Sequence, residues 1–494
     1  MYFLGLDIGS SSSKVSVLDA KTGKSIASTH YPKTELAINA PQAGFAEQDP
    51  NSWWSAVKAA CAELFDNAEF DPKQIEAIGI SYQMHGLVCV DKQQEVIRPA
   101  IIWCDSRAVE IGDKAFKSIG EKTCLSQLLN SPGNFTASKL KWVKENQPDL
   151  YQQIDKIMLP GDFIAMKLTG EITTTPSGLS EGVLWNFAEN TIAHSVLEEY
   201  GFESNLIPNI VPSFADQGTV SQSAAQELGL RAGIKVTYRG GDQPNNAMSL
   251  NVMEPGEVAA TAGTSGVVYA VTDKNAYDPK SRVNTFQHVS STEQEKRNGV
   301  LLCVNGTGRL YSWVRSLLNT QNSAPSYPAL NAMAEKVNIG SDGLVLHPFG
   351  NGAERVLQNK NMGGHMRNID FNRHQLGHIV RGAQEGIVFA LKYGFDVLTE
   401  MGVSSQVVRA GKGNMFLSPI FVEAFVNSCQ TSVELYDTDG AEGAARAAGL
   451  GLGYFTNRDE MFNGLTLVER FEPQADKSEQ YAKAYQDWKQ YLEL

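Results

Sequence analysis

The first segment that could do chemistry lies at residues 7–14, DIGSSSSK. It separates two apolar, β-branched runs, a pattern that predicts a strand, a tight turn and a second strand. Glycine lets the backbone approach an anion, serine hydroxyls and a lysine add donors and positive charge, and the carboxylate of Asp7 could hold a hydrated Mg²⁺. A phosphate site and a polar hairpin turn without a ligand are equally good interpretations of this segment alone. The candidate phosphate contacts are Gly9, Ser10, Ser11 and Lys14.

Residues 257–271 repeat this arrangement about half the chain later, with the turn GTSG at 263–266 between two apolar runs. The recurrence suggests an internal duplication with one unit per domain. Two such turns that face each other would clamp the phosphates of a nucleotide, with Gly263 and Thr264 as contacts, so the interpretation without a ligand becomes less favoured. The first turn is not a Walker loop, because it lacks the glycine-rich spacing that ends in Gly-Lys-Ser/Thr.

A second candidate carboxylate is Asp242, in the segment GGDQ at 240–243, directly after a short predicted strand at 235–238. Two glycines beside a carboxylate allow a substrate and the backbone to come close. In phosphoryl transfer such a carboxylate would orient the attacking hydroxyl and accept its proton. The equally weighted alternative is that Asp242 caps a helix that begins near Asn245.

Two polar loops follow predicted strands of the N-terminal half: SYQMHG at 81–86 and WCDSR at 103–107. Loops at strand ends are where ligands bind in α/β domains, and this mixture of amide, imidazole, carboxylate and apolar groups suits a polyhydroxylated ligand. A lone histidine is more often structural, and none of the eight histidines has neighbours at the spacing of zinc ligands. The candidate substrate contacts are Gln83, Met84, His85, Trp103, Asp105 and Asp242.

The elements that must position these residues alternate between amphipathic and short apolar segments, which predicts a mixed α/β fold. A chain of 494 residues exceeds a single hydrophobic core. We predict two domains that change near residues 240–242 and meet closely along a cleft, because no long linker separates them. The last stretch, 476–494, has aromatic residues at helical spacing and predicts a terminal helix packed on the surface.

Composition excludes several partners. The net charge of −13 is spread along the chain without a basic run, so nucleic acid is not expected as a partner. The N-terminus lacks the basic start of a signal peptide, and no apolar run is long enough for a membrane span. The six cysteines are scattered without paired spacing. They are predicted to be reduced thiols in a cytoplasmic enzyme.

These motifs together resemble the FGGY carbohydrate kinases over residues 1–454. The first turn matches, EQDPNSWW at 47–54 is similar to the family's EQDP..WW, and FTASKLKWV at 135–143 is similar to its FTAPKLLWV signature. Within the family, the QMHG loop resembles the members that phosphorylate D-xylulose, whose sugar contacts fall on Met84 and His85. The Arg-Glu loop of the family's glycerol kinases is absent from this position.

The resemblance implies an α/β fold of two ribonuclease-H-like (actin-like, Hsp70-like ATPase) domains around an interdomain cleft. It places the sugar in an N-terminal domain at 1–243 and ATP in a C-terminal domain at 244–455, before a helical extension at 456–494. Asp242 corresponds to the proton acceptor, and Asp7 to the carboxylate near Mg²⁺, which it would hold through water. The implied nucleotide contacts in the C-terminal domain are Gly263, Thr264, Gly308, Gly411 and Asn414.

The expected activity is therefore ATP-dependent phosphorylation of D-xylulose to D-xylulose 5-phosphate, by an enzyme that could be a homodimer. Two alternatives stay open. One is a kinase of the same family for L-ribulose, L-fuculose, arabinitol or gluconate. The other is an actin-like or Hsp70-like ATPase without sugar kinase activity, which is less favoured because the chain carries the two polar loops and lacks an added peptide-binding domain.

Overall fold

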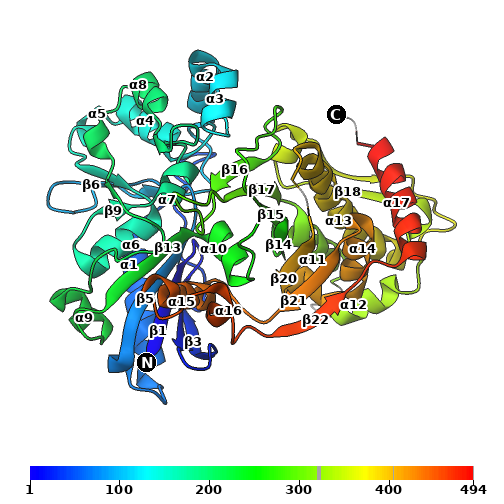
Figure 1. Ribbon diagram of the computed structural model, residues 1–494. Coiled ribbons are helices and arrows are strands. Elements are labelled where there is room, and N and C mark those ends of the chain that lie inside the picture. Colours follow the sequence, from blue (N-terminus) through cyan, green and yellow to red (C-terminus); the bar gives the residue numbers. More distant parts are fainter. Residues whose placement is uncertain (320–323, 404, 493–494) are drawn as a thin grey trace.

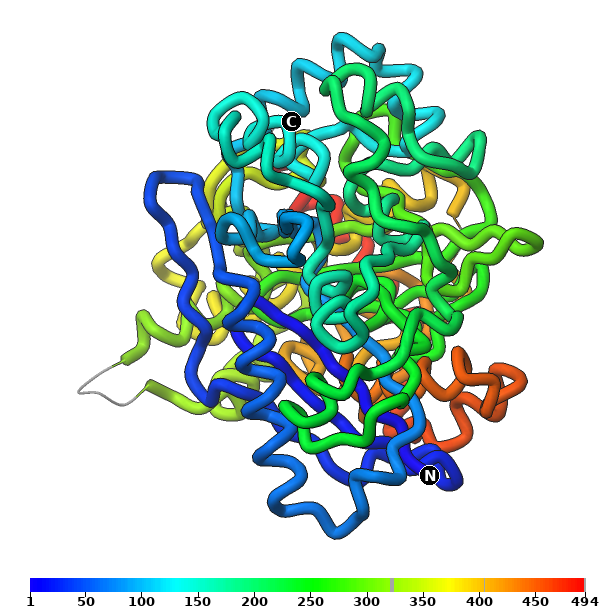
Figure 2. Tube along the Cα trace, turned by 90° about the vertical axis from the view of Figure 1, so that its left-hand side faces the viewer, coloured from blue at the N-terminus to red at the C-terminus, as the bar shows by residue number. Residues whose placement is uncertain are grey.

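The computed structural model describes residues 1–319, 324–403 and 405–492. Figure 1 shows two lobes, with the N-terminus at the edge of the first and the C-terminus on the second. Figure 2 looks onto the first lobe, where a late segment of the chain, coloured orange, lies beside the blue N-terminal strands. The two halves of the sequence therefore do not separate completely into the two lobes.

The first lobe is built on a five-stranded sheet with the order β13-β5-β1-β2-β3. The first three strands form antiparallel pairs, while β5 and β13 continue the sheet in parallel with β1. The turn at 9–12 joins the first two strands, as predicted. The strands are β1 (Tyr2–Ile8), β2 (Ser13–Asp19), β3 (Ser25–Tyr31), β5 (Ile75–Tyr82) and β13 (Lys235–Gly241).

Helices α1 (Pro50–Asp66) and α6 (Pro160–Thr169) cover one face of this sheet, and α9 (Gln222–Leu228) packs on both helices. The first begins where Asp49 accepts a hydrogen bond from the backbone N–H of Asn51, with proline at the first helical position. Its apolar residues, including Trp53 and Trp54, are buried in the first-lobe core. Local capping and an apolar stripe thus fix this layer.

The other face of the first sheet is covered by α15 (Gly440–Gly451), which comes from the far end of the sequence. This alanine-rich helix lies very close to the sheet. A side chain added at Gly5 would place its Cβ 1.8 Å from the carbonyl oxygen of Ala441, and one at Gly79 would place it 2.0 Å from that of Ala444. Glycine is therefore required at both strand positions. The predicted C-terminal domain, 244–455, thus contributes a helix to the first lobe.

The second lobe holds a seven-stranded sheet with the order β16-β17-β15-β14-β20-β21-β22. Its five middle strands repeat the first sheet: three antiparallel strands, then two that run parallel to β14. The turn GTSG joins β14 and β15, so both predicted turns occupy equivalent places in two similar sheets. The strands are β14 (Glu257–Ala262), β15 (Gly266–Thr272), β16 (Asn284–Gln287), β17 (Asn298–Val304), β20 (Val407–Gly411), β21 (Ser432–Tyr436) and β22 (Leu467–Phe471).

Helices and a small hairpin complete the second lobe. The predicted terminal helix is present as α17 (Ala475–Gln490), with Tyr481, Tyr485 and Trp488 buried. The segment 456–494, expected to be helical, also contains β22, which pairs with β21 at the edge of the sheet. The remaining elements are α11 (Thr307–Leu317), α12 (Tyr327–Ala334), β18 (Val345–Phe349), β19 (Gly363–Arg367), α13 (Leu376–Glu400) and α14 (Pro419–Cys429). The short helix α16 (Arg458–Met461) packs instead on α15, beside the first lobe.

The predicted sugar loops open a long insertion between β5 and β13, and β16 of the second sheet reaches across to it. The side chain of Asn130 donates to the carbonyl of Thr285, 2.6 Å, and the backbone N–H of Gln287 donates to Ser180, 2.9 Å. The lobes therefore touch beside the insertion (Figure 1). Strand β4 (Glu47–Gln48), which precedes β5, pairs with β7 (Ala100–Ile101) of the insertion. The other elements of the insertion are β6 (Val88–Val90), α2 (Val109–Ile119), α3 (Glu121–Gln127), α4 (Thr136–Asn146), α5 (Pro148–Tyr151), β8 (Lys156–Met158), β9 (Thr173–Thr174), α7 (Pro176–Glu181), β10 (Trp185–Asn186), β11 (Thr191–Ile192), α8 (His194–Tyr200) and β12 (Asn209–Ile210).

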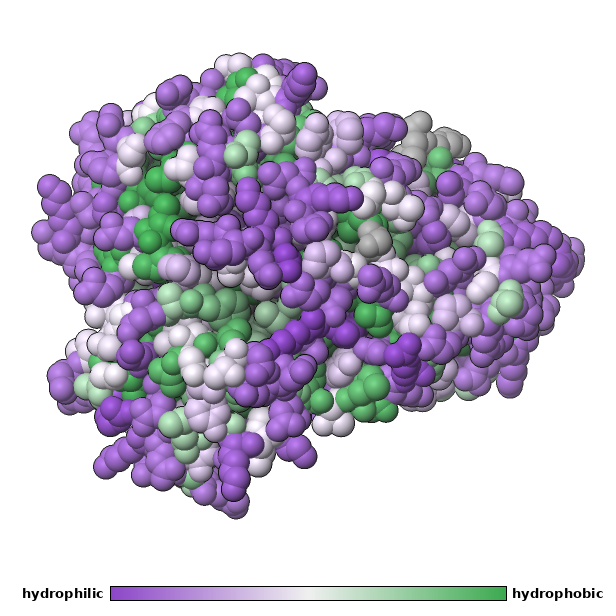
Figure 3. Space-filling view, viewed as in Figure 1, coloured by the Kyte–Doolittle hydropathy of each residue, from purple (hydrophilic) through white to green (hydrophobic). Residues whose placement is uncertain are grey.

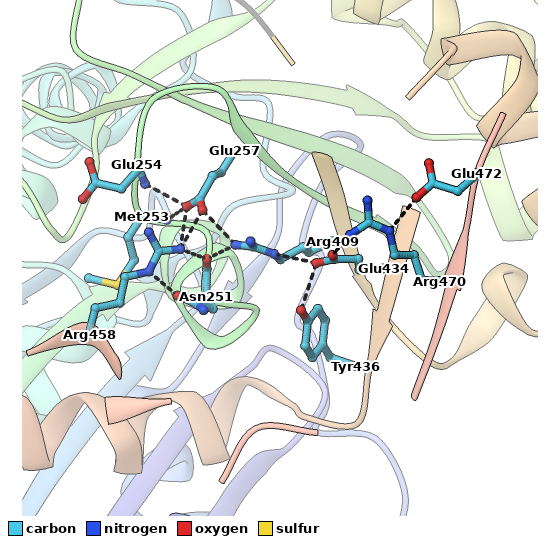
Figure 4. Close-up of polar contacts among 10 residues, drawn as sticks. All are labelled: Asn251, Met253, Glu254, Glu257, Arg409, Glu434, Tyr436, Arg458, Arg470 and Glu472. Carbon is cyan, nitrogen blue, oxygen red and sulfur yellow. Dashed lines mark hydrogen bonds and ion pairs between the residues drawn. The ribbon is translucent and has the colours of Figure 1, made fainter. Parts of the chain in front are cut away.

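A chain of ion pairs lies where the polypeptide crosses between the lobes (Figure 4). Arg458 of α16 donates to both carboxylate oxygens of Glu257, 2.7 and 2.8 Å. Arg409 joins Glu257 to Glu434, 3.0 Å to each, and Arg470 donates to Glu434, 2.9 Å. Because α16 packs on α15, this network ties the helix that covers the first sheet to four strands of the second, β14, β20, β21 and β22. It fixes the lobes at the edge away from the contact made by β16.

Polar residues dominate the face seen in Figure 3, and hydrophobic residues appear there in smaller patches. Among the helices within the described ranges, none is long and apolar enough to cross a membrane. The apolar residues instead fill separate cores in the two lobes.

Candidate active site

A cavity of about 260 Å³ lies between the lobes, and both carry predicted site residues into it. Asp7 and Lys14 line it from the first lobe, where they face each other in the register of β1 and β2. Gly411 and Asn414 line it from the second lobe. The structure therefore brings the predicted phosphate-side residues Asp7 and Lys14 to the same cavity as two residues predicted to contact the adenosine, about 400 positions later in the sequence.

A larger cavity, about 590 Å³, adjoins this one and shares Asn414 with it. Gly263, Thr264 and Gly308 line it, as the predicted nucleotide contacts of the second lobe. The backbone N–H of Gly308 donates to the carbonyl of Gly263, 2.9 Å, and that of Arg309 to the carbonyl of Thr264, 3.2 Å. The start of α11 is thus bonded to the second turn, which gives a rigid backbone cradle beside a pocket of suitable size for a nucleoside.

The first turn is held differently. Its Gly9 N–H donates to the carbonyl of Ser12, 3.0 Å, and the hydroxyl of Ser10 accepts a hydrogen bond from the indole of Trp103, 3.3 Å. The backbone carbonyl of Ser11 accepts from Leu36, 2.7 Å. None of these three turn residues lines the two cavities. Their contact with phosphate stays a prediction, while the structure places the turn beside the predicted sugar loop at Trp103.

Asp242 stands at the junction of β13 and α10 (Asp242–Ser249). The alternative that it caps a helix starting near Asn245 is wrong: the helix begins at Asp242 itself, and Gly241 is the capping residue. Burial raises the pKa of Asp242 to about 7, and the nearby carboxylate of Asp7 adds to the increase. A carboxylate with this pKa can accept a proton at neutral pH and is well matched to general base catalysis.

Asp7 lies at the end of β1 and accepts a hydrogen bond from the hydroxyl of Ser81, 2.8 Å. Burial raises the pKa of this carboxyl, against the attraction of Lys14. A side chain at Gly440 would place its Cβ 2.8 Å from the carboxylate, so the backbone of α15 closes over this side. No group of three His, Cys, Asp or Glu residues suited to a metal occurs in the described chain. The contact of Asp7 with Mg²⁺ stays a prediction, and a Mg²⁺ ion beside this single carboxylate would take most of its ligands from phosphates and water.

The QMHG loop lies against the backbone that precedes Asp242. A Cβ added at Gly241 would fall 2.7 Å from the side chain of Met84, and the backbone N–H of Gln83 donates to the carbonyl of Ile8, 2.8 Å. His85 has a φ of 61°, a strained value for a residue other than glycine. Its Nδ1 lies 2.9 Å from the carbonyl of Glu181, and burial lowers its pKa to about 3. The ring is therefore neutral, with Nδ1–H donating to the carbonyl and Nε2 left as an acceptor.

The two candidate residues of the second predicted sugar loop, Trp103 and Asp105, have different surroundings. The Trp103 side chain is exposed. Asp105 is buried, and its carboxylate oxygens bind the guanidinium of Arg107 at 2.7 to 3.0 Å and the backbone N–H of Ala46 at 2.6 Å. This geometry does not favour a direct contact between Asp105 and a sugar, and it gives the carboxylate a role in holding the loop.

Comparison with known proteins decides the family. The model for the N-terminal domain of the FGGY family of carbohydrate kinases matches residues 2–249, and the model for its C-terminal domain matches 258–452. The chain belongs to the FGGY family of carbohydrate kinases. The boundary predicted at 243 and 244 falls inside α10, before the end of the first match.

Individual relatives of this FGGY kinase agree with that assignment. The xylulose kinase of Bacillus subtilis is 27% identical over 99% of this chain and 96% of the relative, and that of Escherichia coli is 28% identical over 82% and 80%. The crystal structure of a xylulose kinase from Rhodospirillum rubrum matches with a TM-score of 0.89 at 24% identity, covering 99% of this chain and 98% of that one. The predicted α/β fold of two ribonuclease-H-like, actin-like domains is confirmed.

Two residues of the kinase site were missed in the sequence. The Nζ of Lys139 is buried and donates to the carbonyls of His85, 2.8 Å, and Ile102, 3.0 Å, which joins the two predicted sugar loops. The side chain of Glu181 is buried beside Gly241 and accepts from Tyr82, 2.6 Å. Lys139 lies in the FTASKLKWV segment, and that motif could have identified it as a site residue. Glu181 stood in no motif.

The pKa of Asp242 predicts the pH dependence of this kinase. Because only the ionised carboxylate accepts a proton, the kcat/KM for sugar should fall about tenfold for each pH unit below 7 and level off above it. The measurement is a profile from pH 5.5 to 8.5 with saturating ATP and Mg²⁺ and excess coupling enzyme. A carboxylate with an ordinary pKa would give a flat profile over this range, which would contradict the assignment.

Proposed function

We propose that this FGGY kinase transfers the γ-phosphoryl group of ATP to the 5-hydroxyl of D-xylulose, which gives D-xylulose 5-phosphate. The observation that carries the proposal is the packing of Met84 against Gly241, because it sets the QMHG loop directly beside the candidate base, Asp242. The curated relatives named xylulose kinase support the choice of sugar.

In this proposal the two lobes bind different substrates. ATP occupies the pair of connected cavities, with its adenosine near Gly308 and Asn414 and its phosphates between the two turns. The sugar lies on the first lobe, along the QMHG loop, where the neutral Nε2 of His85 accepts a hydrogen bond from a hydroxyl. Closure of the lobes then excludes water from the reacting groups.

Proton transfer falls to Asp242. Its carboxylate orients the attacking hydroxyl and accepts the proton as the oxygen bonds to the γ-phosphorus and ADP leaves. Lys14 and the backbone N–H groups of both turns offset the negative charge of the phosphates. Mg²⁺ held by Asp7 would neutralise part of the same charge. The enzyme is further expected to be cytoplasmic, and a homodimer stays a prediction.

Two alternatives are carried with it. A kinase for L-ribulose, L-fuculose, arabinitol or gluconate would use the same base and the same nucleotide site with a different sugar pocket. A gluconate kinase from Lactobacillus acidophilus matches this fold with a TM-score of 0.89, but at 20% identity it shows the fold alone. An ATPase that acts on polypeptides would hydrolyse ATP without any sugar.

A panel of sugars separates these functions. ADP release would be measured with D-xylulose, L-ribulose, L-fuculose, D-arabinitol and gluconate, and without sugar. We expect kcat/KM for D-xylulose to exceed that for every other member at least about tenfold, because a single mispaired polar group costs that much or more. A higher value for another sugar would replace the substrate, and hydrolysis stimulated by unfolded peptide alone would overturn the kinase.

A further inference from the structure

Within the part of the chain that the structure describes, one cationic side chain at the junction of the lobes forms no ion pair. Arg355 lies in a short 3₁₀ helix, residues 355–357, of the second lobe. Within the described ranges its one hydrogen bond runs from Nη1 to the carbonyl of Ser281, a long 3.4 Å. Among the described residues, the carboxylate of Asp113 of α2 attracts the guanidinium but forms no hydrogen bond or ion pair with it. Because half-buried guanidinium groups are normally paired, we expect Arg355 to bind acceptor atoms of a ligand.

Besides Ser281 of its own lobe, Arg355 lies close to residues of the opposite lobe. Its guanidinium lies 5.8 Å from the ring centroid of Phe135, and its Nη2 would be 3.5 Å from a Cβ added at Gly133. The ring of Phe135 in turn contacts that of His85, with centroids 4.9 Å apart. Arg355 is also close enough to His85 to lower the pKa of the imidazole. The positively charged guanidinium of Arg355, from the lobe proposed to bind ATP, thus lies close to the loop proposed to bind the sugar.

The backbone next to Arg355 is fixed by hydrogen bonds within the second lobe. The preceding residue, Glu354, is buried, and its carboxylate accepts from the backbone N–H of Asn305 at 3.0 and 3.1 Å. That loop leads directly into α11, whose first turn is bonded to the second phosphate turn. Arg355 therefore projects from backbone that is rigidly connected to the nucleotide cradle.

The phosphates of ATP are a less suitable partner than the sugar. Among the described residues, neither cavity assigned to the nucleotide includes Arg355 in its lining, and its neighbours Phe135 and Gly133 lie on the sugar side. A guanidinium is a planar fork of donors that matches two neighbouring oxygen atoms. Adjacent oxygens are what a linear polyhydroxy ketone presents along its whole length.

We propose that Arg355 is a specificity-determining residue of the second lobe, which donates hydrogen bonds to two adjacent oxygens of the sugar lying over His85 and Phe135. The proposal rests on the proposed function. It explains why a cation faces the sugar loop without a carboxylate: the ligand supplies the acceptors. It also gives sugar binding a direct contact with the lobe that binds ATP, so that a bound sugar favours the closed arrangement of the two lobes.

The test separates the two substrates kinetically. The variants are Arg355→Met, which keeps the length and apolar packing, Arg355→Lys, which keeps a charge without the fork, and Arg373→Met, an exposed arginine of the same lobe as the matched control. We expect KM for sugar to rise about 10- to 100-fold in Arg355→Met and less in Arg355→Lys, because hydrogen bonds to charged groups are lost. KM for ATP should stay within about twofold in both, and Arg373→Met should match the wild type.

The outcomes are distinct. A rise in KM for ATP equal to that for sugar would assign Arg355 to lobe closure or phosphate binding and overturn the proposal, as would an unchanged KM for sugar. A thermal midpoint and a nucleotide affinity equal to those of the wild type would show that Arg355→Met is folded. If that variant does not fold, the same kinetic constants are measured for Arg355→Lys. The assay uses whichever sugar the wild-type enzyme phosphorylates fastest, so a wrong choice of D-xylulose changes the substrate but not the expected split.

Discussion

Replacing Asp242 by Asn is expected to lower kcat for sugar phosphorylation at least about 1000-fold at pH 8. The amide is nearly isosteric with the carboxylate but cannot accept a proton, so the loss reports on the base and not on packing. KM for ATP should change little, because Asp242 lies at the end of the first-lobe strand β13 and not in the nucleotide cavities. The measurement is steady-state ADP release at saturating sugar and ATP.

The matched control for this experiment is Asp216→Asn. That carboxylate is also associated with β13, through an exposed ion pair with Lys235 at 3.0 Å, but it lies at the opposite end of the strand from Asp242. Its removal should leave kcat within about twofold, since exposed pairs contribute little. Near-normal turnover in Asp242→Asn, with the pH profile of the wild type, would discard Asp242 as the proton acceptor.

The parts of the site that could be predicted are those whose structure depends on residues close together in the sequence. A glycine and small hydroxyl residues between two apolar runs make a hairpin whatever surrounds them, so both turns and their strands were correctly placed. The glycine pair before Asp242 likewise marks a strand end that runs directly into a helix. The duplication could be seen because each half contains its own copy of the same local pattern.

The parts that could not be predicted depend on contacts between distant segments. The approach of α15 to the first sheet requires Gly5 and Gly79, but nothing near either glycine identifies the helix that it meets. Asp105 has the composition of a ligand contact, yet Arg107, two residues later, binds its carboxylate. Arg355 is next to its functional neighbours only because β16 and the 3₁₀ helix of the second lobe reach the insertion of the first.

The second large effect is expected from a single methyl group, in Gly308→Ala. The added Cβ would lie 2.3 Å from the carbonyl oxygen of Gly263 and 3.1 Å from its carbonyl carbon. Both atoms are backbone, so the clash can be relieved only by moving α11 away from the second turn. That movement would break the 2.9 Å hydrogen bond between the two glycines and displace the amides around Thr264. Because misplacement of such groups by about 1 Å is costly, kcat/KM for ATP should fall roughly 100-fold.

The same substitution at Gly364 is the control. Gly364 lies in β19 of the same lobe, and an added Cβ there would meet its nearest heavy atom at 3.6 Å, an ordinary contact. Gly364→Ala should therefore keep the kinetic constants of the wild type. In Gly308→Ala, binding of sugar measured without nucleotide should be normal, because the first lobe is untouched. A KM for ATP within about threefold of the wild type would show that the bond between α11 and the second turn does not position the phosphates, and the cradle would then have to be built by the first turn alone.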